Sequence, residues 1–283
     1  MNALEFIAGG RRWRARLEAP VDLAIPLRFD GGPQPSFFVD SPARSEPLQV
    51  GGFTGSVAAG ASCNCAVQTL APHCHGTHTE CVGHVTLDPV TIADLTPVAP
   101  CLALVLSVQP QALGEAAARA AAGPADAADR VIRREVIEHA ARPWAHLPFA
   151  GIVIRTLPND TSKLGRAYSG SPSPAPYFLP DAMLWLVERD VTSLVVDLPS
   201  LDRADDGGLL AAHRVYWGLP AGAQDAALAR RGRALVTELA FVPDSVPDGP
   251  YLLDLQVPAF GADAAPSRPV LYPLQPLAGS ATP

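Results

Sequence analysis

The sequence lacks the features that mark membrane-spanning and secreted proteins. No apolar stretch of its 283 residues reaches the roughly 18 residues needed to span a bilayer. The arginines at positions 11, 12, 14 and 16 are not followed by the apolar core of a signal peptide. We therefore expect a soluble, cytoplasmic protein with no membrane partner.

Charge and cysteine content argue against two further classes. The formal net charge is -7, and the basic residues form no cluster that could neutralise a run of phosphates. Nucleic acid is therefore not an expected partner. Five cysteines are an odd number, which argues against a disulfide framework. With 48% hydrophobic residues the chain can bury a full core, and we expect residues 1–283 to form one domain.

Alternating strand and helix patterns predict an α/β architecture. Apolar spacing and flanking glycines or prolines predict three helices, over residues 113–122, 127–140 and 181–188. The same criteria predict strands over residues 63–70, 151–156 and 192–197. Short strands between residues 251 and 273 are expected to close a sheet or barrel. A surface helix is expected over residues 221–233, with Arg230, Arg231 and Arg233 on a solvated face.

Residues 73–84 contain four of the seven histidines, two of the five cysteines and a carboxylate. In an extended chain, residues of the same parity face the same side. This places four candidate ligands together: Cys74, His78, Glu80 and His84. His73 and His75 would face the other way, as hydrogen-bonding residues. Because groups of this kind bind borderline transition metals and are costly to bury unpaired, the stretch predicts a metal-dependent active site.

Two other zinc motifs do not fit. The pair His78 and Glu80 matches the His-x-Glu of zinc deaminases, but no Pro-Cys-x-x-Cys follows it. The spacing of the cysteines at positions 63, 65, 74 and 81 resembles no zinc ribbon, and a site made from them would leave the histidines unexplained.

The order of residues in the cluster resembles the signature of the cyclase-like metal hydrolases, which include bacterial kynurenine formamidase and isatin hydrolase. That signature is His-x-Gly-Thr-His-x-Asp-x-Pro-x-His, and Gly76-Thr77-His78, Glu80 and His84 fall in register with it. Segments 153–156, 196–202 and 237–239, together with His213, resemble later landmarks of the family. The resemblance spans roughly residues 22 to 272.

The resemblance implies a metal site on a mixed, barrel-like sheet surrounded by helices, commonly in a homodimer or higher homo-oligomer. Carried over by position, the implied metal ligands are Cys74, His78, Glu80, His213 and Glu238. His84 matches the family's proton-handling histidine. Cys74 replaces a histidine and Glu80 an aspartate; the soft thiolate favours Zn²⁺ over Mn²⁺, with one or two ions per chain. Glu188 or Asp202 are alternatives to Glu238 as the downstream carboxylate.

The working hypothesis is hydrolysis of a small-molecule amide, formamide or cyclic amide, with His84 as general acid and base. Lactonase or cyclase/dehydratase chemistry at the same site is an alternative. A non-catalytic metal-binding protein with a closed four-ligand site is another. A third is a metal-free hydrolase in which Cys74 is the nucleophile and His78 or His84 the base.

Overall fold

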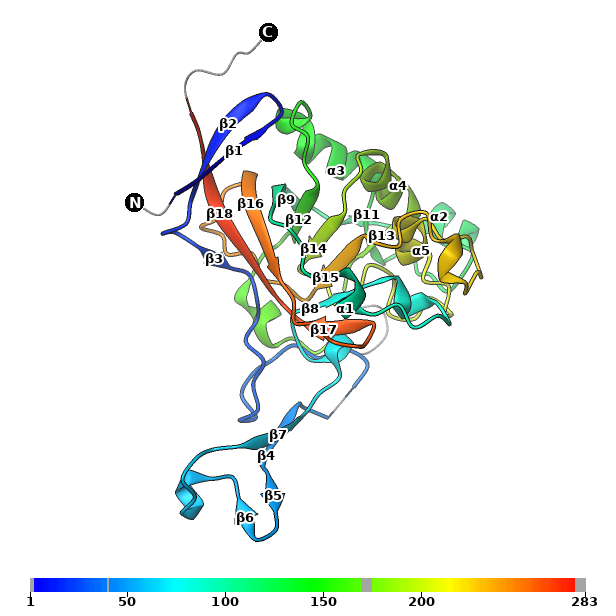
Figure 1. Ribbon diagram of the computed structural model, residues 1–283. Helices are drawn as coiled ribbons and strands as arrows, with labels where there is room; N and C mark the ends of the chain where they lie inside the picture. Colours follow the sequence, from blue (N-terminus) through cyan, green and yellow to red (C-terminus); the bar gives the residue numbers. More distant parts are fainter. Residues whose placement is uncertain (1–2, 40, 169–174, 278–283) are drawn as a thin grey trace.

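A large mixed sheet forms the centre of the molecule, and its middle strands are parallel (Figure 1). The computed structural model describes residues 3–39, 41–168 and 175–277. Eleven strands form this sheet. Along its main path they are β1 (Ala3–Ala8), β2 (Arg11–Arg16), β18 (Arg268–Pro276), β16 (Gly249–Gln256), β9 (Cys101–Val108), β12 (Gly151–Thr156), β14 (Ser193–Val196), β15 (Leu235–Glu238), β8 (His78–Glu80) and β17 (Ala264–Pro266), with β3 (Val21–Asp22) paired to β18.

The parallel strands β9, β12, β14 and β15 are buried on both faces, which explains their nearly continuous apolar sequences. Helices α3 (Arg134–Ala141), α4 (Pro180–Glu188) and α5 (Ala211–Trp217) cover one face (Figure 1). Side chains of the opposite face pack against β3, β16 and β18. The predicted strands at 151–156 and 192–197 and the predicted helix at 181–188 are confirmed as β12, β14 and α4.

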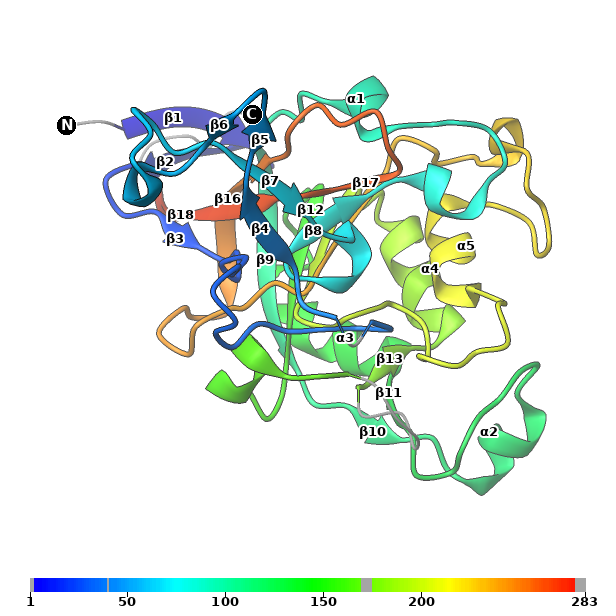
Figure 2. The ribbon, with the colours of Figure 1, turned by 90° about the horizontal axis from the view of Figure 1, so that it is seen from below.

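The C-terminal strands complete the sheet, as expected. β16 and β18 pair with each other and are longer than the short strands predicted there. β17 lies at the end of the sheet opposite β1, beside β8 (Figure 2). No helix in the described ranges, including the one-turn α1 (Ile92–Leu95), is long and apolar enough to cross a membrane.

Two of the predicted helices differ from the structure. The helix expected at 113–122 is present as the short α2 (Glu115–Ala120). Only the second half of 127–140 is helical, because β11 (Arg130–Ile132) joins a small separate sheet with β10 (Gln111–Ala112) and β13 (Tyr177–Phe178).

The prediction of a surface helix at 221–233 is wrong, since the only helical turn in this segment is a 3-10 turn at Ala226–Leu228. The solvated position expected for Arg231 is also wrong. Its guanidinium donates hydrogen bonds to the backbone oxygens of Tyr216 and Val191, and its side chain is mostly buried. This arginine therefore fastens the segment to the core.

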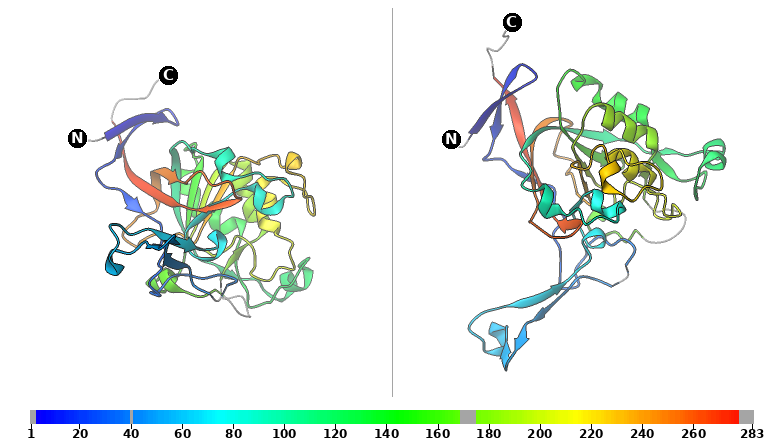
Figure 3. Two further views of the ribbon diagram at one scale, coloured as in Figure 1. Left: turned by 60° about the horizontal axis from the view of Figure 1, so that its bottom comes forward. Right: turned by 45° about the vertical axis from the view of Figure 1, so that its right-hand side comes forward.

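Residues 44–69 form an excursion that extends away from the body of the molecule (Figures 1 and 3). We call it the arm. It consists of two short ladders, β4 (Arg44–Pro47) with β7 (Ala66–Thr69) and β5 (Gln49–Val50) with β6 (Phe53–Thr54). The strand predicted at 63–70 is present as β7. Its end leads directly into the histidine-rich segment.

Candidate metal centre

Strand β8 places His78 and Glu80 on one face, because residues two apart in a strand point to the same side. Its two neighbours bring further carboxylates to that face. In the pairing with β15, Glu238 lies opposite His78. In the pairing with β17, Ala264 lies opposite Glu80, which puts Asp263 just before it at the edge of the cluster.

Gly76 and Thr77 hold the start of this strand in place. Gly76 has a φ of +135°, a conformation that L side chains rarely adopt. The buried Thr77 hydroxyl accepts a hydrogen bond from Ile25 N at 2.8 Å and donates one to Leu239 O at 2.5 Å. The oxygen of Gly76 lies 3.0 Å from His78 Nδ1, which fixes the imidazole with Nε2 toward the cluster.

The extended conformation predicted for the whole stretch is wrong on both sides of β8, because a 3-10 turn at Pro72–Cys74 precedes Gly76 and another at Val82–Val85 carries His84. The first of these turns has a direct effect on the cluster. The turn brings His73 into the cluster, with Nδ1 3.1 Å from Glu80 Oε2. Cys74 belongs to none of the groups of potential ligands found among the described residues. His73 thus occupies the place predicted for Cys74. His75 makes the hydrogen bonds expected of it, to Ala71 N and Ser41 O.

Helix α5 contributes His213 from its first turn, and Asp202 positions it. The Asp202 carboxylate accepts hydrogen bonds from the backbone amides of Ala212 and His213 and lies 2.7 Å from His213 Nδ1. Asp202 therefore supports the histidine, and Glu238 is the carboxylate that faces the cluster. Glu188, the other alternative, pairs with Arg134 at the surface at 2.7 Å.

The donor atoms converge. Three groups of potential ligands have all their donor atoms within 4.8 Å of one another: His73, His78 and Glu80; His73, His84 and Asp263; and Glu80, His213 and Glu238. His213 Nε2 lies 2.8 Å from Glu80 Oε1 and 3.4 Å from Glu238 Oε1. His78 Nε2 lies 3.4 Å from Glu238 Oε2.

Although these donor atoms lie close together, several of them are buried and form no hydrogen bond. Seven buried side-chain nitrogen or oxygen atoms in the described ranges have no hydrogen-bond partner, and four of them lie in this cluster: His78 Nε2, both Glu80 carboxylate oxygens and His213 Nε2. Leaving such atoms unpaired is costly. Nitrogen and oxygen donors that converge without bonding one another fit a bound cation, which would satisfy all four.

The electrostatics agree with this conclusion. Burial alone would raise the pKa of Glu80, but the charges of His84 and His213 lower it well below its ordinary range. Burial lowers the pKa of His73, yet the Asp263 carboxylate hydrogen bonded to its Nε2 and the Glu80 carboxylate 3.1 Å from its Nδ1 outweigh burial and raise this pKa to about 10. Burial also lowers the pKa of His213, but nearby carboxylates, Glu80 first, raise it, so the cluster favours positive charge.

The inner part of the centre is buried, and its outer part is partly exposed to solvent. His78, Glu80, His213 and Glu238 are at most 4% exposed, whereas the side chains of His73, His84 and Asp263 are 27%, 28% and 39% exposed. We call the partly exposed side of the centre, formed by His73, His84 and Asp263, its mouth.

Asp263 was not found from the sequence, because no motif surrounds it. Its Oδ2 lies 2.9 Å from His73 Nε2 and 3.4 Å from His84 Nδ1. Hydrogen bonds from these two histidines lower the pKa of Asp263. Its carboxylate therefore holds the outer nitrogen of each ring, and His84 Nε2 is left 3.8 Å from Glu80 Oε2.

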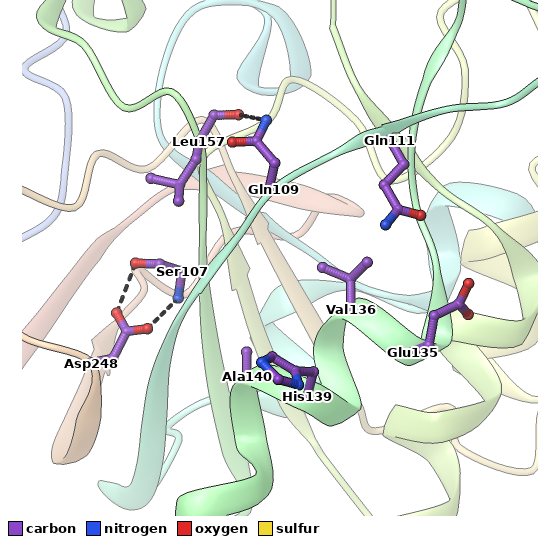
Figure 4. A pocket seen from close by; sticks show the side chains of 9 residues that line it. All are labelled: Ser107, Gln109, Gln111, Glu135, Val136, His139, Ala140, Leu157 and Asp248. Atoms are coloured by element: carbon purple, nitrogen blue, oxygen red, sulfur yellow. Dashed lines mark hydrogen bonds between the residues drawn. The ribbon is translucent and has the colours of Figure 1, made fainter.

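Two hollows in the structure lie outside this mouth. A groove of about 420 Å³ beside α3 contains no residue of the cluster, and its Ser107 and Gln109 side chains are already hydrogen bonded to Asp248 and Leu157 O (Figure 4). A more apolar cavity of about 360 Å³ between α2 and β13 reaches Asp202. Because Asp202 bonds His213 Nδ1, this cavity lies on the Nδ1 side of the imidazole, away from the Nε2 atom that faces the cluster.

Comparison with known proteins identifies the family. Residues 21–203 match the family model described as "Putative cyclase", so the chain belongs to this family. A search of the curated proteins by sequence finds no match.

Solved structures with this fold are similar over 90% of the chain. Isatin hydrolase A from Labrenzia aggregata is 15% identical, with 93% of its chain covered and a TM-score of 0.57. A predicted metal-dependent hydrolase from Bacillus stearothermophilus is 14% identical, with 98% covered and a TM-score of 0.54. A structure described as a novel cyclase is 13% identical, with 87% covered and a TM-score of 0.58. At these identities the likeness establishes the mixed α/β cyclase-family fold.

Proposed function

We propose that this chain is a metal-dependent hydrolase that cleaves the C–N bond of a small-molecule amide, formamide or cyclic amide. The observation that carries the proposal is the set of four buried, unpartnered donor atoms beside the partly exposed His84. Support also comes from the family match and from the similar folds of metal-dependent hydrolases and isatin hydrolases.

In this proposal His78, Glu80, His213 and Glu238 hold the metal, and His73 joins them through Nδ1. Each of the three histidines has its other ring nitrogen next to an oxygen: Asp263 for His73, Gly76 O for His78 and Asp202 for His213. Outer partners of this kind orient metal-binding imidazoles. Because the ligand groups share Glu80 and His73, the cluster has donors for one or two ions.

The donor set suits Zn²⁺ and Mn²⁺ alike. Because Cys74 lies in none of the ligand groups, the preference for zinc that rested on its thiolate loses its basis. Three imidazoles and two carboxylates are acceptable to both ions.

A metal bound here would lower the pKa of a bound water to about 7 and polarise the substrate carbonyl. His84 performs the proton transfers. Asp263 holds its Nδ1 side, so Nε2 faces Glu80 and the mouth of the site. Nε2 accepts a proton from the attacking water and returns it to the leaving nitrogen. The C–O bond forms, the C–N bond breaks, and the products differ from the substrate by one water.

Features of the site disfavour two of the alternatives. A closed structural metal site would not leave the ligand His73 and the neighbouring His84 and Asp263 more than a quarter exposed. A Cys74 nucleophile would need a base, but no hydrogen bond links Cys74 Sγ to His78 or His84 in the described ranges, and burial raises the pKa of its thiol.

The experiment that tests the proposal combines metal analysis with a substrate panel. Purified protein is assayed for bound metal by mass spectrometry, and then for turnover of aryl formamides, isatin-like cyclic amides and lactones before and after chelation. We expect bound metal, loss of turnover on chelation, and products heavier than the substrate by one water. Full activity after exhaustive chelation would contradict the metal mechanism. A lactone as the preferred substrate, or a product formed without added water, would assign the site to lactonase or cyclase/dehydratase chemistry.

A further inference from the structure

The three side chains at the mouth of the centre are potential metal ligands in their own right. His73, His84 and Asp263 place their donor atoms within 4.8 Å of one another. The other two ligand groups both contain Glu80, whereas this group has a carboxylate of its own. Asp263 also lies outside residues 21–203, the part of the chain that matches the family model. The mouth therefore has a carboxylate donor that the family match does not include.

Two imidazoles lie against each other beside this carboxylate. The ring centroids of His73 and His84 are 4.3 Å apart, with 31° between the ring planes. His73 Nε2 and His84 Nδ1 lie 2.9 and 3.4 Å from the same atom, Asp263 Oδ2. Within residues 3–39, 41–168 and 175–277, no group hydrogen bonds to the other oxygen, Asp263 Oδ1. A cation that enters from solvent therefore finds this oxygen free, next to an imidazole nitrogen.

Charge favours a cation at the mouth even when the buried ligands are occupied. Glu80, Glu238 and Asp263 are three carboxylates, and a single divalent ion on the buried ligands neutralises only two of their charges. The Asp263 side chain is 39% exposed, whereas those of Glu80 and Glu238 are at most 4% exposed. The remaining negative charge therefore attracts a second cation at the exposed carboxylate. Imidazole nitrogen and carboxylate oxygen are both ligands of Zn²⁺.

We propose that the mouth binds a further Zn²⁺ ion through His84 Nδ1 and Asp263 Oδ1, and that this outer ion inhibits the enzyme. The inhibition rests on the proposed function, in which His84 Nε2 accepts a proton from the attacking water. His73 Nδ1 faces the buried ligands, so its Nε2 keeps the hydrogen bond to Asp263 Oδ2. The outer ion has two protein ligands where the buried site offers five donors, so it binds more weakly than the catalytic metal.

The inhibition follows from where the proton of His84 resides. A neutral imidazole has one N–H group and one nitrogen lone pair. In the active enzyme the N–H is at Nδ1, toward Asp263, and the lone pair is at Nε2. When Nδ1 binds the outer ion, it releases its proton and Nε2 takes one up, so the ring stays neutral. Nε2–H has no lone pair with which to accept a proton from water. Because general acid–base catalysis contributes about 100- to 10,000-fold, kcat should fall at least about 100-fold when the outer ion saturates.

The first test is a calorimetric titration of the full chain with Zn²⁺. It uses a Cys63→Ser/Cys65→Ser background, because these exposed thiols of the arm are themselves zinc ligands. We expect tight binding followed by one weaker event. Asp263→Asn should weaken the second event at least about 100-fold, since removing even an outer partner of a ligand costs about 10- to 100-fold. Asp190→Asn is the matched control and should leave both events unchanged, because its side chain is 92% exposed on the body.

Long-range ¹H–¹⁵N NMR of the imidazole rings provides a readout that is independent of activity. With only the tight site filled, the His84 proton should be at Nδ1. Over the zinc range of the weak event it should move to Nε2, and Nδ1 should take the shift of a metal-bound nitrogen. Turnover of the substrate identified by the panel should fall over the same range. In Asp263→Asn the inhibition, measured against that variant's own activity without excess zinc, should need at least about 100-fold more zinc.

Three results would overturn the proposal. They are the lack of a weak event at millimolar zinc, a weak event that keeps its affinity in Asp263→Asn, and a His84 proton that stays at Nδ1 in excess zinc. The tight event in Asp263→Asn shows that this variant is folded. Turnover that survives exhaustive chelation would contradict the proposed function, whereas calorimetry and NMR would still decide whether the mouth binds zinc.

Discussion

His73→Ala and Cys74→Ala distinguish the metal ligand expected from the motif from the one the fold places in the cluster. The motif puts Cys74 at the ligand position, whereas the 3-10 turn presents His73 Nδ1 at 3.1 Å from Glu80 Oε2. We expect His73→Ala to lose metal affinity and Cys74→Ala to keep it. The turn itself should survive in Cys74→Ala, because its hydrogen bonds use the backbone N and O of residue 74.

The expected size of the effect follows from the role of the imidazole. Removing an outer partner of a ligand typically weakens metal binding about 10- to 100-fold, so removing a ligand should cost at least about 100-fold. Metal at about 1,000 times the wild-type Kd stabilises the fold by about 4 kcal/mol, and a 100-fold weaker site retains about 1.4 kcal/mol. At about 2 °C per kcal/mol for a chain of this size, the metal-induced rise in Tm falls from about 8 °C to about 3 °C.

The assay is a thermal melt with and without added metal, together with a chelator-competition titration that gives the metal Kd. The comparison uses the metal-induced change in Tm, because His73→Ala also removes the hydrogen bond to Asp263 and so alters the metal-free protein. A Cys74→Ala protein that loses metal, beside a His73→Ala protein that retains it, would refute the reasoning and restore the ligand predicted by the motif.

Three further predictions concern the centre and the core. His84→Ala should retain metal but lose about 100- to 10,000-fold in kcat, measured on the substrate identified by the panel, while the exposed His139→Ala outside the site retains activity. Asp202→Asn should weaken metal binding about 10- to 100-fold in a chelator titration, because it loosens the metal-facing histidine of α5; unchanged affinity would contradict this positioning role. Lys163→Met leaves Asp197 buried without its 2.7 Å partner and should cost about 3–5 kcal/mol in urea unfolding at neutral pH. Burial raises the pKa of Asp197, so the loss should shrink as pH falls and the carboxyl becomes protonated; an equal loss at acid pH would contradict the assignment.

Much of the sheet could be predicted from the sequence, and part of the centre could not. The runs at 151–156 and 192–197 were identifiable because strands buried on both faces must be apolar throughout. The pairing of His78 with Glu80 followed from the period of a strand. The alternation failed on both sides of β8: before Gly76, where a 3-10 turn rotates His73 inward, and after Glu80, where a second 3-10 turn at Val82–Val85 carries His84; local spacing gives no sign of either turn.

Tertiary contacts decided the remaining differences. Asp263 enters the centre through the register of β17 against β8, and its own neighbours in the sequence carry no signal. The helix expected at 221–233 did not form, because Arg231 uses its guanidinium to bind backbone oxygens of the core. In both places a partner distant in sequence determines the local conformation, which a reading of one segment at a time does not capture.

The order in which the chain is synthesised has a consequence for the centre. His73 and Asp263 touch although 190 residues separate them, and β8 gains its second neighbour only when β17 is present. A nascent chain that ends near residue 240 already contains His73, His78, Glu80, His213 and Glu238, but Asp263 in the outer wall of the centre is still missing. The complete centre can therefore form only after the last strands have left the ribosome. A truncation just before residue 263 therefore keeps all five proposed ligands but removes the carboxylate that orients His73 and His84.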